Sequence, residues 1–141
     1  MRKSILNLAP ILLIILFSYS AIVKGYDINL FQGQMIQSPL LPLSLIKILS
    51  YTIPLFELVV VALLIFDKTR EIGFHLSYFI MLLFTLYLVT LVMFFGHNIP
   101  CACGGILGNM GYTTHIIFNI FFTLLPLLAI IINKQSKSYA V

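Results

Sequence analysis

Four long apolar stretches limit what this chain can fold into more than any other feature. They cover residues 5–23, 43–66, 72–95 and 113–132. Each is close to the ~20 residues that cross a ~30 Å hydrocarbon core as a helix. They are rich in Leu, Ile, Phe and Val without strict alternation, and they are too long for barrel strands. Because every backbone group in lipid must be paired within its own segment, we predict four transmembrane helices.

The composition leads to the same class of protein. Only 9% of the residues are charged and 61% are hydrophobic, whereas a soluble domain is about 25% charged. A water-exposed surface cannot be built from so few charges. We therefore expect an all-α integral membrane protein, a four-helix bundle that forms a single transmembrane domain over residues 1–141.

The distribution of Lys and Arg predicts the orientation. Lys24 and Lys47 fall on or near one side of the predicted bundle. The other side holds Arg2, Lys3, Lys68, Arg70, Lys134 and Lys137. Basic residues accumulate on the cytoplasmic side of membrane proteins. We therefore predict a multi-pass protein of the cell inner membrane, with both termini and the 67–71 connection cytoplasmic. The 24–42 and 96–112 segments would face the periplasm.

The first apolar stretch has a second interpretation. MRKS followed by an apolar run also resembles a signal peptide, and Ser18-Tyr19-Ser20 is a weak cleavage pattern. The polar stretch that follows continues directly into sequence with functional features. We therefore expect this first helix to be retained.

The 24–42 segment predicts a short interfacial element between the first two helices. Asp27 or Asn29 is placed to cap a short helix, and the prolines at Pro39 and Pro42 would end it. A helix lying in the membrane interface and an irregular loop both remain open.

Both cysteines of the chain lie in one short stretch, GHNIPCACGG at residues 96–105. A disulfide between Cys101 and Cys103 would close a very small ring, and the resulting strain makes such a bond easy to reduce. A structural disulfide stabilises more when it closes a long loop. Disulfides also persist outside the cytoplasm. We therefore predict that this C-x-C pair is redox-active.

Two residues at the start of the last helix are candidates for the same site. His115 and Asn119 are four residues apart and share a helix face beside the cysteine loop. A histidine there would lower a thiol pKa or transfer a proton during exchange. The alternative is an interfacial histidine, with Asn119 bonding to another helix. A zinc or copper site with His97, Cys101, Cys103 and His115 is a further alternative, but its spacing matches no common zinc pattern.

Glu57 is the other unusual residue, because an acid at membrane depth is costly and indicates function by default. Its nearest plausible partner is Lys24 at the end of the first helix. We predict that the two pair and hold these helices together, and we keep a proton-relay role as the alternative.

Several of these pieces carry a resemblance to a known family. They are SYSAIVK at 18–24, SPLLP at 38–42, PLFE at 54–57 and CACGG at 101–105. With them the chain resembles the methylamine-utilisation MauE branch of the DoxX-like membrane proteins over most of its length. The resemblance implies a four-helix membrane bundle with a redox role and thioredoxin-like partners outside the cytoplasm. It carries over Cys101 and Cys103 as the redox site, with Lys24 and Glu57 as positions of the family pattern.

The predicted function is thiol–disulfide exchange at the outer face of the membrane, which would make the protein an oxidoreductase. We expect the lipid bilayer and an extracytoplasmic thioredoxin-like or substrate protein as partners, and no nucleic acid. A metal-handling protein and a non-catalytic subunit of an envelope complex are the alternatives. The plan also resembles quinone-linked disulfide-generating proteins, although those use two cysteine pairs. A quinone cofactor therefore stays open, and its candidate neighbours are Phe79, Phe84, Tyr87, Phe118, Phe121 and Phe122.

Overall fold

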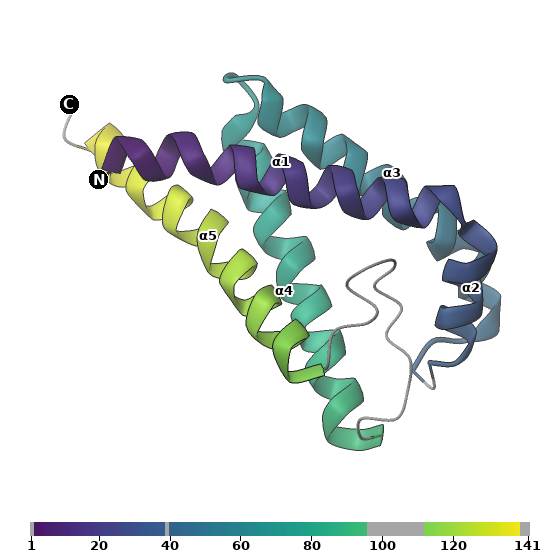
Figure 1. Ribbon diagram of the computed structural model, residues 1–141. Helices are drawn as coiled ribbons and strands as arrows, with labels where there is room; N and C mark the ends of the chain where they lie inside the picture. Colours follow the sequence, from purple (N-terminus) through teal and green to yellow (C-terminus); the bar gives the residue numbers. More distant parts are fainter. Residues whose placement is uncertain (1, 39, 96–111, 139–141) are drawn as a thin grey trace.

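The computed structural model describes residues 2–38, 40–95 and 112–138, and over these residues it is all-helical. Figure 1 shows its helices, which are α1 (Arg2–Tyr26), α2 (Ile28–Ile36), α3 (Leu43–Ile65), α4 (Arg70–Phe95) and α5 (Tyr112–Ser138). Four segments are long and apolar enough to cross a membrane: Ile5–Tyr26, Leu43–Ile65, Arg70–Phe95 and Thr113–Gln135. The predicted fold class and its four spans are confirmed. Three of these helices extend past the predicted ranges, because helical hydrogen bonding continues beyond the apolar residues.

The segment between α1 and α3 forms a helix rather than an irregular loop. Asp27 is its N-cap, and its side chain accepts a hydrogen bond from the backbone N–H of Leu30 at 2.9 Å. Phe31 and Met35 are buried and pack with Ile46 of α3. The predicted short helix therefore exists, and one of its faces is held against the first half of α3.

The long helices form two pairs that diverge. α1 packs along α3 and α4 packs along α5, and Figure 1 shows the two pairs separating from the end where the chain termini lie. All four helices meet in one apolar core, which consists of Ala9, Leu13, Phe17, Val60, Leu64, Phe74, Met81 and Ala129.

The turn between α3 and α4 brings these two helices close together before they diverge. The Thr69 hydroxyl donates to the Leu63 carbonyl at 2.9 Å, and Arg70 Nε donates to the Leu64 carbonyl at 3.2 Å. A Cβ atom at Gly73 would lie 2.9 Å from Leu64 Cδ2 and 3.2 Å from the Leu64 backbone nitrogen. The absence of a side chain at Gly73 therefore lets α4 pack directly on α3.

The opposite end of the bundle is the one where α1 and α4 end and where α3 and α5 begin. We refer to it as the connection end, because the two longer connections of the chain leave from it. One of them contains α2, and the other is the 96–111 segment with both cysteines.

Candidate functional site

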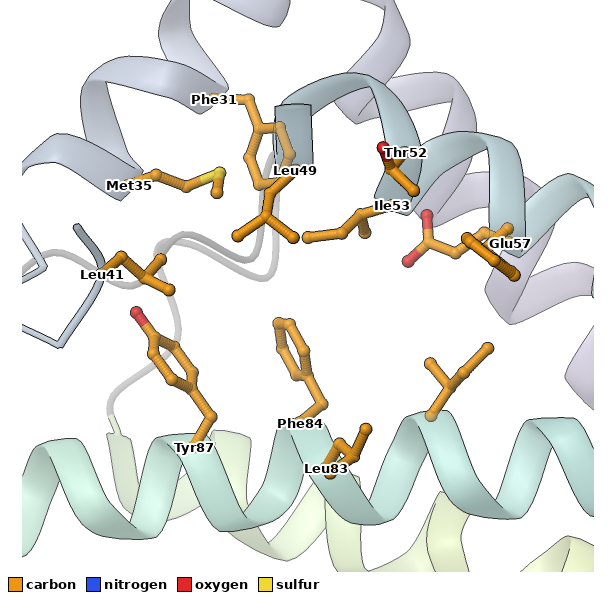
Figure 2. A pocket seen from close by; sticks show the side chains of 12 residues that line it. Phe31, Met35, Leu41, Leu49, Thr52, Ile53, Glu57, Leu83, Phe84 and Tyr87 are labelled. Atoms are coloured by element: carbon orange, nitrogen blue, oxygen red, sulfur yellow. The ribbon is translucent and has the colours of Figure 1, made fainter. Parts of the chain in front are cut away.

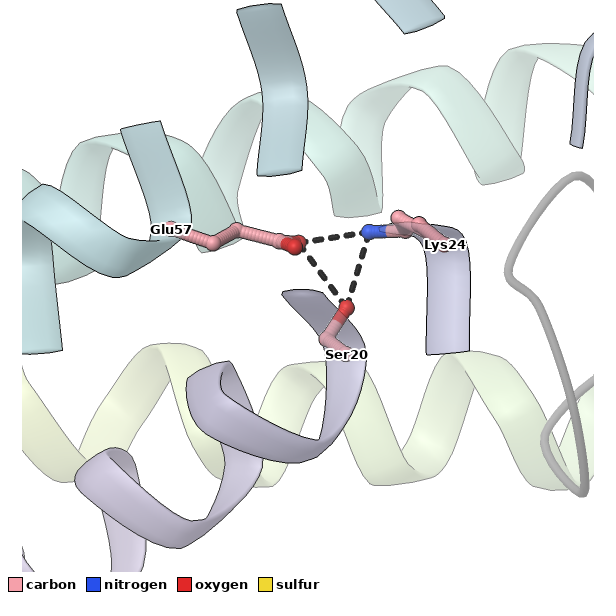
Figure 3. A network of polar contacts seen from close by, with 3 residues as sticks. All are labelled: Ser20, Lys24 and Glu57. Atoms are coloured by element: carbon pink, nitrogen blue, oxygen red, sulfur yellow. Dashed lines mark hydrogen bonds and ion pairs between the residues drawn. The ribbon is translucent and has the colours of Figure 1, made fainter. Parts of the chain in front are cut away.

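A buried ion pair lies between α1 and α3. Figure 3 shows that Lys24 Nζ donates to Glu57 Oε1 and to Ser20 Oγ, and that Ser20 Oγ donates to Glu57 Oε1. The three distances are 2.5, 2.8 and 2.9 Å in that order. The Lys24 and Glu57 side chains are only 3% and 6% exposed. The two residues that were predicted to pair are therefore in direct contact, with a serine hydroxyl completing the triangle.

This ion pair lies well inside the membrane-spanning part of the bundle. Glu57 is eight residues from Ile65 and 14 from Leu43, the two ends of α3. At 1.5 Å per residue this puts Glu57 about 12 Å from one end of α3 and about 21 Å from the other. A charge at such depth is tolerated only when it is paired and hydrogen-bonded.

Two aromatic rings cover the lysine side of the pair. Lys24 Nζ lies 5.5 Å from the ring centroid of Phe84 on α4 and 5.7 Å from that of Phe31 on α2. Both distances are within the ~6 Å over which a cation is attracted by an aromatic face. The ammonium is therefore enclosed by a carboxylate, a hydroxyl and two ring faces.

Helix α5 adds two polar side chains to this region. His115 and Asn119 are 2% and 3% exposed and lie one helical turn apart. Together with Ser20, Lys24 and Glu57 they line one cavity of about 40 Å³. The structure thus brings together four predicted site residues, from α1, α3 and α5. We call Ser20, Lys24, Glu57, His115 and Asn119 the buried polar cluster.

Two atoms of the cluster could each form a hydrogen bond that the described residues do not supply. Glu57 Oε2 and Asn119 Nδ2 are buried and have no hydrogen-bond partner among the residues that the structure describes. The first is an acceptor and the second a donor. A cavity holds a water molecule when about 10–15 Å³ is open to the centre of one, and about 40 Å³ is open here. The cavity therefore has room for a water molecule among the polar side chains of α1, α3 and α5.

Several buried polar residues were not predicted from the sequence, and three of them take part in contacts between the long helices. One is Ser20, and the others are Thr85 and Thr123, whose hydroxyl oxygens lie 3.2 Å apart between α4 and α5. A signal for Ser20 existed, since it precedes Lys24 by four residues and therefore shares its helix face. For the two threonines the sequence holds no comparable signal, because threonine is common in membrane helices as a backbone-bonded residue.

The predicted thiol pair is not part of the described structure. Cys101, Cys103 and His97 lie outside the described residues, between Phe95 at the end of α4 and Tyr112 at the start of α5. The metal alternative depends on these same residues. In the described ranges, no group of three or more His, Cys, Asp or Glu side chains is arranged to hold a metal ion.

Comparison with known proteins agrees with this architecture. The family model described as methylamine utilisation protein MauE matches residues 2–132. No curated protein and no solved structure matches the chain. The family match and the four apolar helices together indicate a multi-pass membrane protein. Membership of this family is consistent with a redox-associated role in the membrane. The chain belongs to the MauE family of methylamine utilisation proteins.

Proposed function

We propose that this protein exchanges disulfides with a partner protein at the extracytoplasmic face of the membrane, and that Cys101 and Cys103 are its redox pair. The observation that carries the proposal is the position of His115. It follows Cys103 by twelve residues in the sequence and lies buried among the polar cluster near the start of α5. A histidine close in sequence to the cysteines thus lines the same cavity as the buried Lys24–Glu57 pair.

The exchange would proceed through a mixed disulfide. One cysteine thiolate attacks the disulfide of the partner, which breaks that S–S bond, forms a new one between the proteins and releases one partner thiolate. The second cysteine then attacks the mixed disulfide and releases the partner's other thiolate. Two electrons pass to the partner, and Cys101 and Cys103 are left joined. The same steps in reverse oxidise the partner.

The buried polar cluster would accept the protons that the thiols release in this reaction and would pass them on. Each thiol of the pair loses its proton before or as it attacks, because only the thiolate is nucleophilic. Among the residues that the structure describes, His115 is the histidine nearest in sequence to the pair, and imidazole is the side chain that most often transfers protons near neutral pH. From His115, a water in the cavity would connect to the free Oε2 atom of Glu57.

The location and orientation belong to the same proposal. Six basic residues on the side of the termini and the α3–α4 turn, against two on the other side, support an inner-membrane protein with both termini inside. The cysteine segment would then face the periplasm, where thioredoxin-like partners can reach it.

Alkylation in intact cells tests the proposal. Cells that express the full chain are treated with reductant or oxidant and then with a mass-tagged maleimide, and the gel shift reports the thiols. We expect two tags after reductant and none after oxidant, and at most one tag in Cys101→Ser or Cys103→Ser. His115→Asn should slow reoxidation, whereas His75→Asn should not, because His75 is exposed near the start of α4.

Three outcomes would contradict the proposal. The first is a pair that accepts tags equally under both conditions. The second is stoichiometric zinc or copper in the purified protein that is lost in Cys101→Ser. The third is full function of the Cys101→Ser/Cys103→Ser variant, as expected for a non-catalytic subunit of an envelope complex.

A further inference from the structure

A second and much larger cavity lies where α3 and α4 diverge. Its volume is about 490 Å³, which is within the ~300–1,000 Å³ range of small-molecule sites. α2, α3 and α4 form its walls, and the aromatic residues among them are Phe31, Phe56, Phe84 and Tyr87. Phe56 and Leu83, two of the lining residues, are more than half exposed. The cavity is therefore accessible from the side of the bundle that faces the bilayer.

Specific contacts frame this cavity toward both ends of α3 and α4. The α3–α4 turn brings the two helices together at Gly73. Toward the connection end, the Tyr87 hydroxyl donates to Ser38 Oγ at 2.7 Å and ties α4 to the segment after α2. α2 fills the space beyond, with Phe31 and Met35 directed toward α3. The cavity is thus framed by ordered elements of the fold.

Glu57 is shared by this cavity and the buried polar cluster. It lines both cavities, and Figure 2 shows its carboxylate at one end of the larger one and the Tyr87 hydroxyl at the other. Glu57 is 5% exposed, and its Oε2 atom has no hydrogen-bond partner in the described part of the chain. A buried acceptor without a partner is costly, so a ligand that donates a hydrogen bond at this point would be favoured.

The depth of Glu57 limits the chemistry of that ligand. An acyl chain offers no hydrogen-bond donor, and the polar groups of phospholipids and sterols remain at the membrane surface. Glu57 lies about 12 Å and about 21 Å from the two ends of its helix. The ligand must therefore be a membrane-soluble molecule that carries a hydroxyl on an otherwise apolar body. A flat ring would also match the surrounding Phe31, Phe56 and Phe84 rings, which favour offset or edge contacts.

We propose that this cavity binds the ring of a membrane quinone, with a hydroxyl of its quinol form donating to Glu57 Oε2. Of the aromatic residues predicted to border a quinone, Phe84 and Tyr87 line the cavity. Phe79 and Phe121 are more than half exposed on the outside of the bundle.

The role of this ligand rests on the proposed function. The thiol pair gives up two electrons and two protons when it closes to a disulfide. A quinone takes up the same two electrons and two protons on its oxygens and becomes a quinol. With a quinone in the cavity, a second cysteine pair is not required to balance the reaction.

Binding to purified full-length protein in lipid nanodiscs tests the inference, with decylubiquinol as the probe. The Cys101→Ser/Cys103→Ser background keeps binding separate from thiol exchange. Leu83→Trp and Ile53→Trp place bulk at the cavity wall from α4 and α3. Leu86→Trp is the matched control, since Leu86 is on the same helix, is 54% exposed against 51% for Leu83, and does not line the cavity.

We expect saturable binding that weakens by about tenfold or more in Leu83→Trp and Ile53→Trp and is unchanged in Leu86→Trp. The dimethyl ether of the quinol, which has no hydroxyl donor, should bind about ten- to a hundredfold more weakly than the quinol. Equal affinity of the quinol and its dimethyl ether, or equal binding in all three tryptophan variants, would overturn the inference.

A failure of the quinone site can be told apart from a failure of the proposed disulfide exchange. Binding that persists while the wild-type thiols fail to cycle would support the quinone site and contradict disulfide exchange. If the Leu83→Trp and Ile53→Trp variants bind quinol normally and their thiols still cycle normally, the quinone site is contradicted. Disulfide exchange is not contradicted by that result.

Discussion

Lys24 and Glu57 depend on each other. Each side chain would be an isolated charge at membrane depth without the other, and breaking a buried pair is costly because it leaves an uncompensated charge. Ser20 adds a hydrogen bond to each partner, and Phe31 and Phe84 cover the ammonium. The cost of two buried charges is thus offset by contacts from three neighbouring residues.

We expect Lys24→Met to lower the free energy of unfolding by about 3–5 kcal/mol, because Glu57 is left charged and unpaired. The double variant Lys24→Met/Glu57→Met should recover most of this loss, since both charges are replaced by apolar groups of similar size. Thermal unfolding in detergent of the wild type, the two single variants and the double variant measures the coupling. Lys47→Met is the control, because Lys47 is exposed on α3. Additive single effects would show that the two residues are not coupled.

At the scale of elements, α2 and the α3–α4 turn set the shape of the interior. α2 has nine residues, and isolated helices below about 12–15 residues are marginal in water. Its Asp27 cap and the burial of Phe31 and Met35 against α3 compensate for its length. The turn acts at the opposite end, where Gly73 sets how closely α4 approaches α3.

Gly73→Ala should destabilise the bundle by about 1–3 kcal/mol, the usual cost of forcing extra volume into a packed interface. The new methyl group would meet both the side chain and the backbone of Leu64, and backbone cannot move away easily. Gly33→Ala is the matched control, because nothing lies within 4 Å of a Cβ at this helical position. That control should be neutral or more stable by about 0.5–1 kcal/mol. Melting temperatures of the two variants test this, and equal effects would contradict it.

At the scale of the whole molecule, the divergence of the two helix pairs creates the interior sites. Where all four long helices meet, the core is apolar. Toward the connection end the pairs separate, and the polar cluster and the larger cavity occupy the space between them. The polar cluster thus includes residues near the end of α1 and the start of α5, and the cysteine segment leads directly into α5.

We expect the two ends of the bundle to differ in their access to impermeant reagents. In a Cys101→Ser/Cys103→Ser background, Tyr26→Cys should react with an impermeant maleimide in intact cells, because Tyr26 is 92% exposed at the connection end. Asp67→Cys should react only after permeabilisation, since this turn carries basic residues typical of the cytoplasmic side. Asp67 is 86% exposed, so burial would not explain its protection. The reverse pattern of labelling would contradict the predicted orientation.

The helices, and the residues that are costly in lipid, were predictable from the amino-acid sequence alone. The four spans were predictable because a membrane forces each segment to pair its own backbone, and Lys24 and Glu57 stood out because charges at depth require a partner. The short helix could be anticipated from Asp27, but its face against α3 could not.

Which helix faces meet depends on the packing of the folded bundle. This packing brought His115 and Asn119 to the Lys24–Glu57 pair, added Ser20, and opened the cavity between α3 and α4. The reason is that lipid is as apolar as a protein interior, so hydrophobic residues occur on every face of a membrane helix. The pattern of apolar residues therefore does not show which face turns inward, and close packing and polar contacts make that choice.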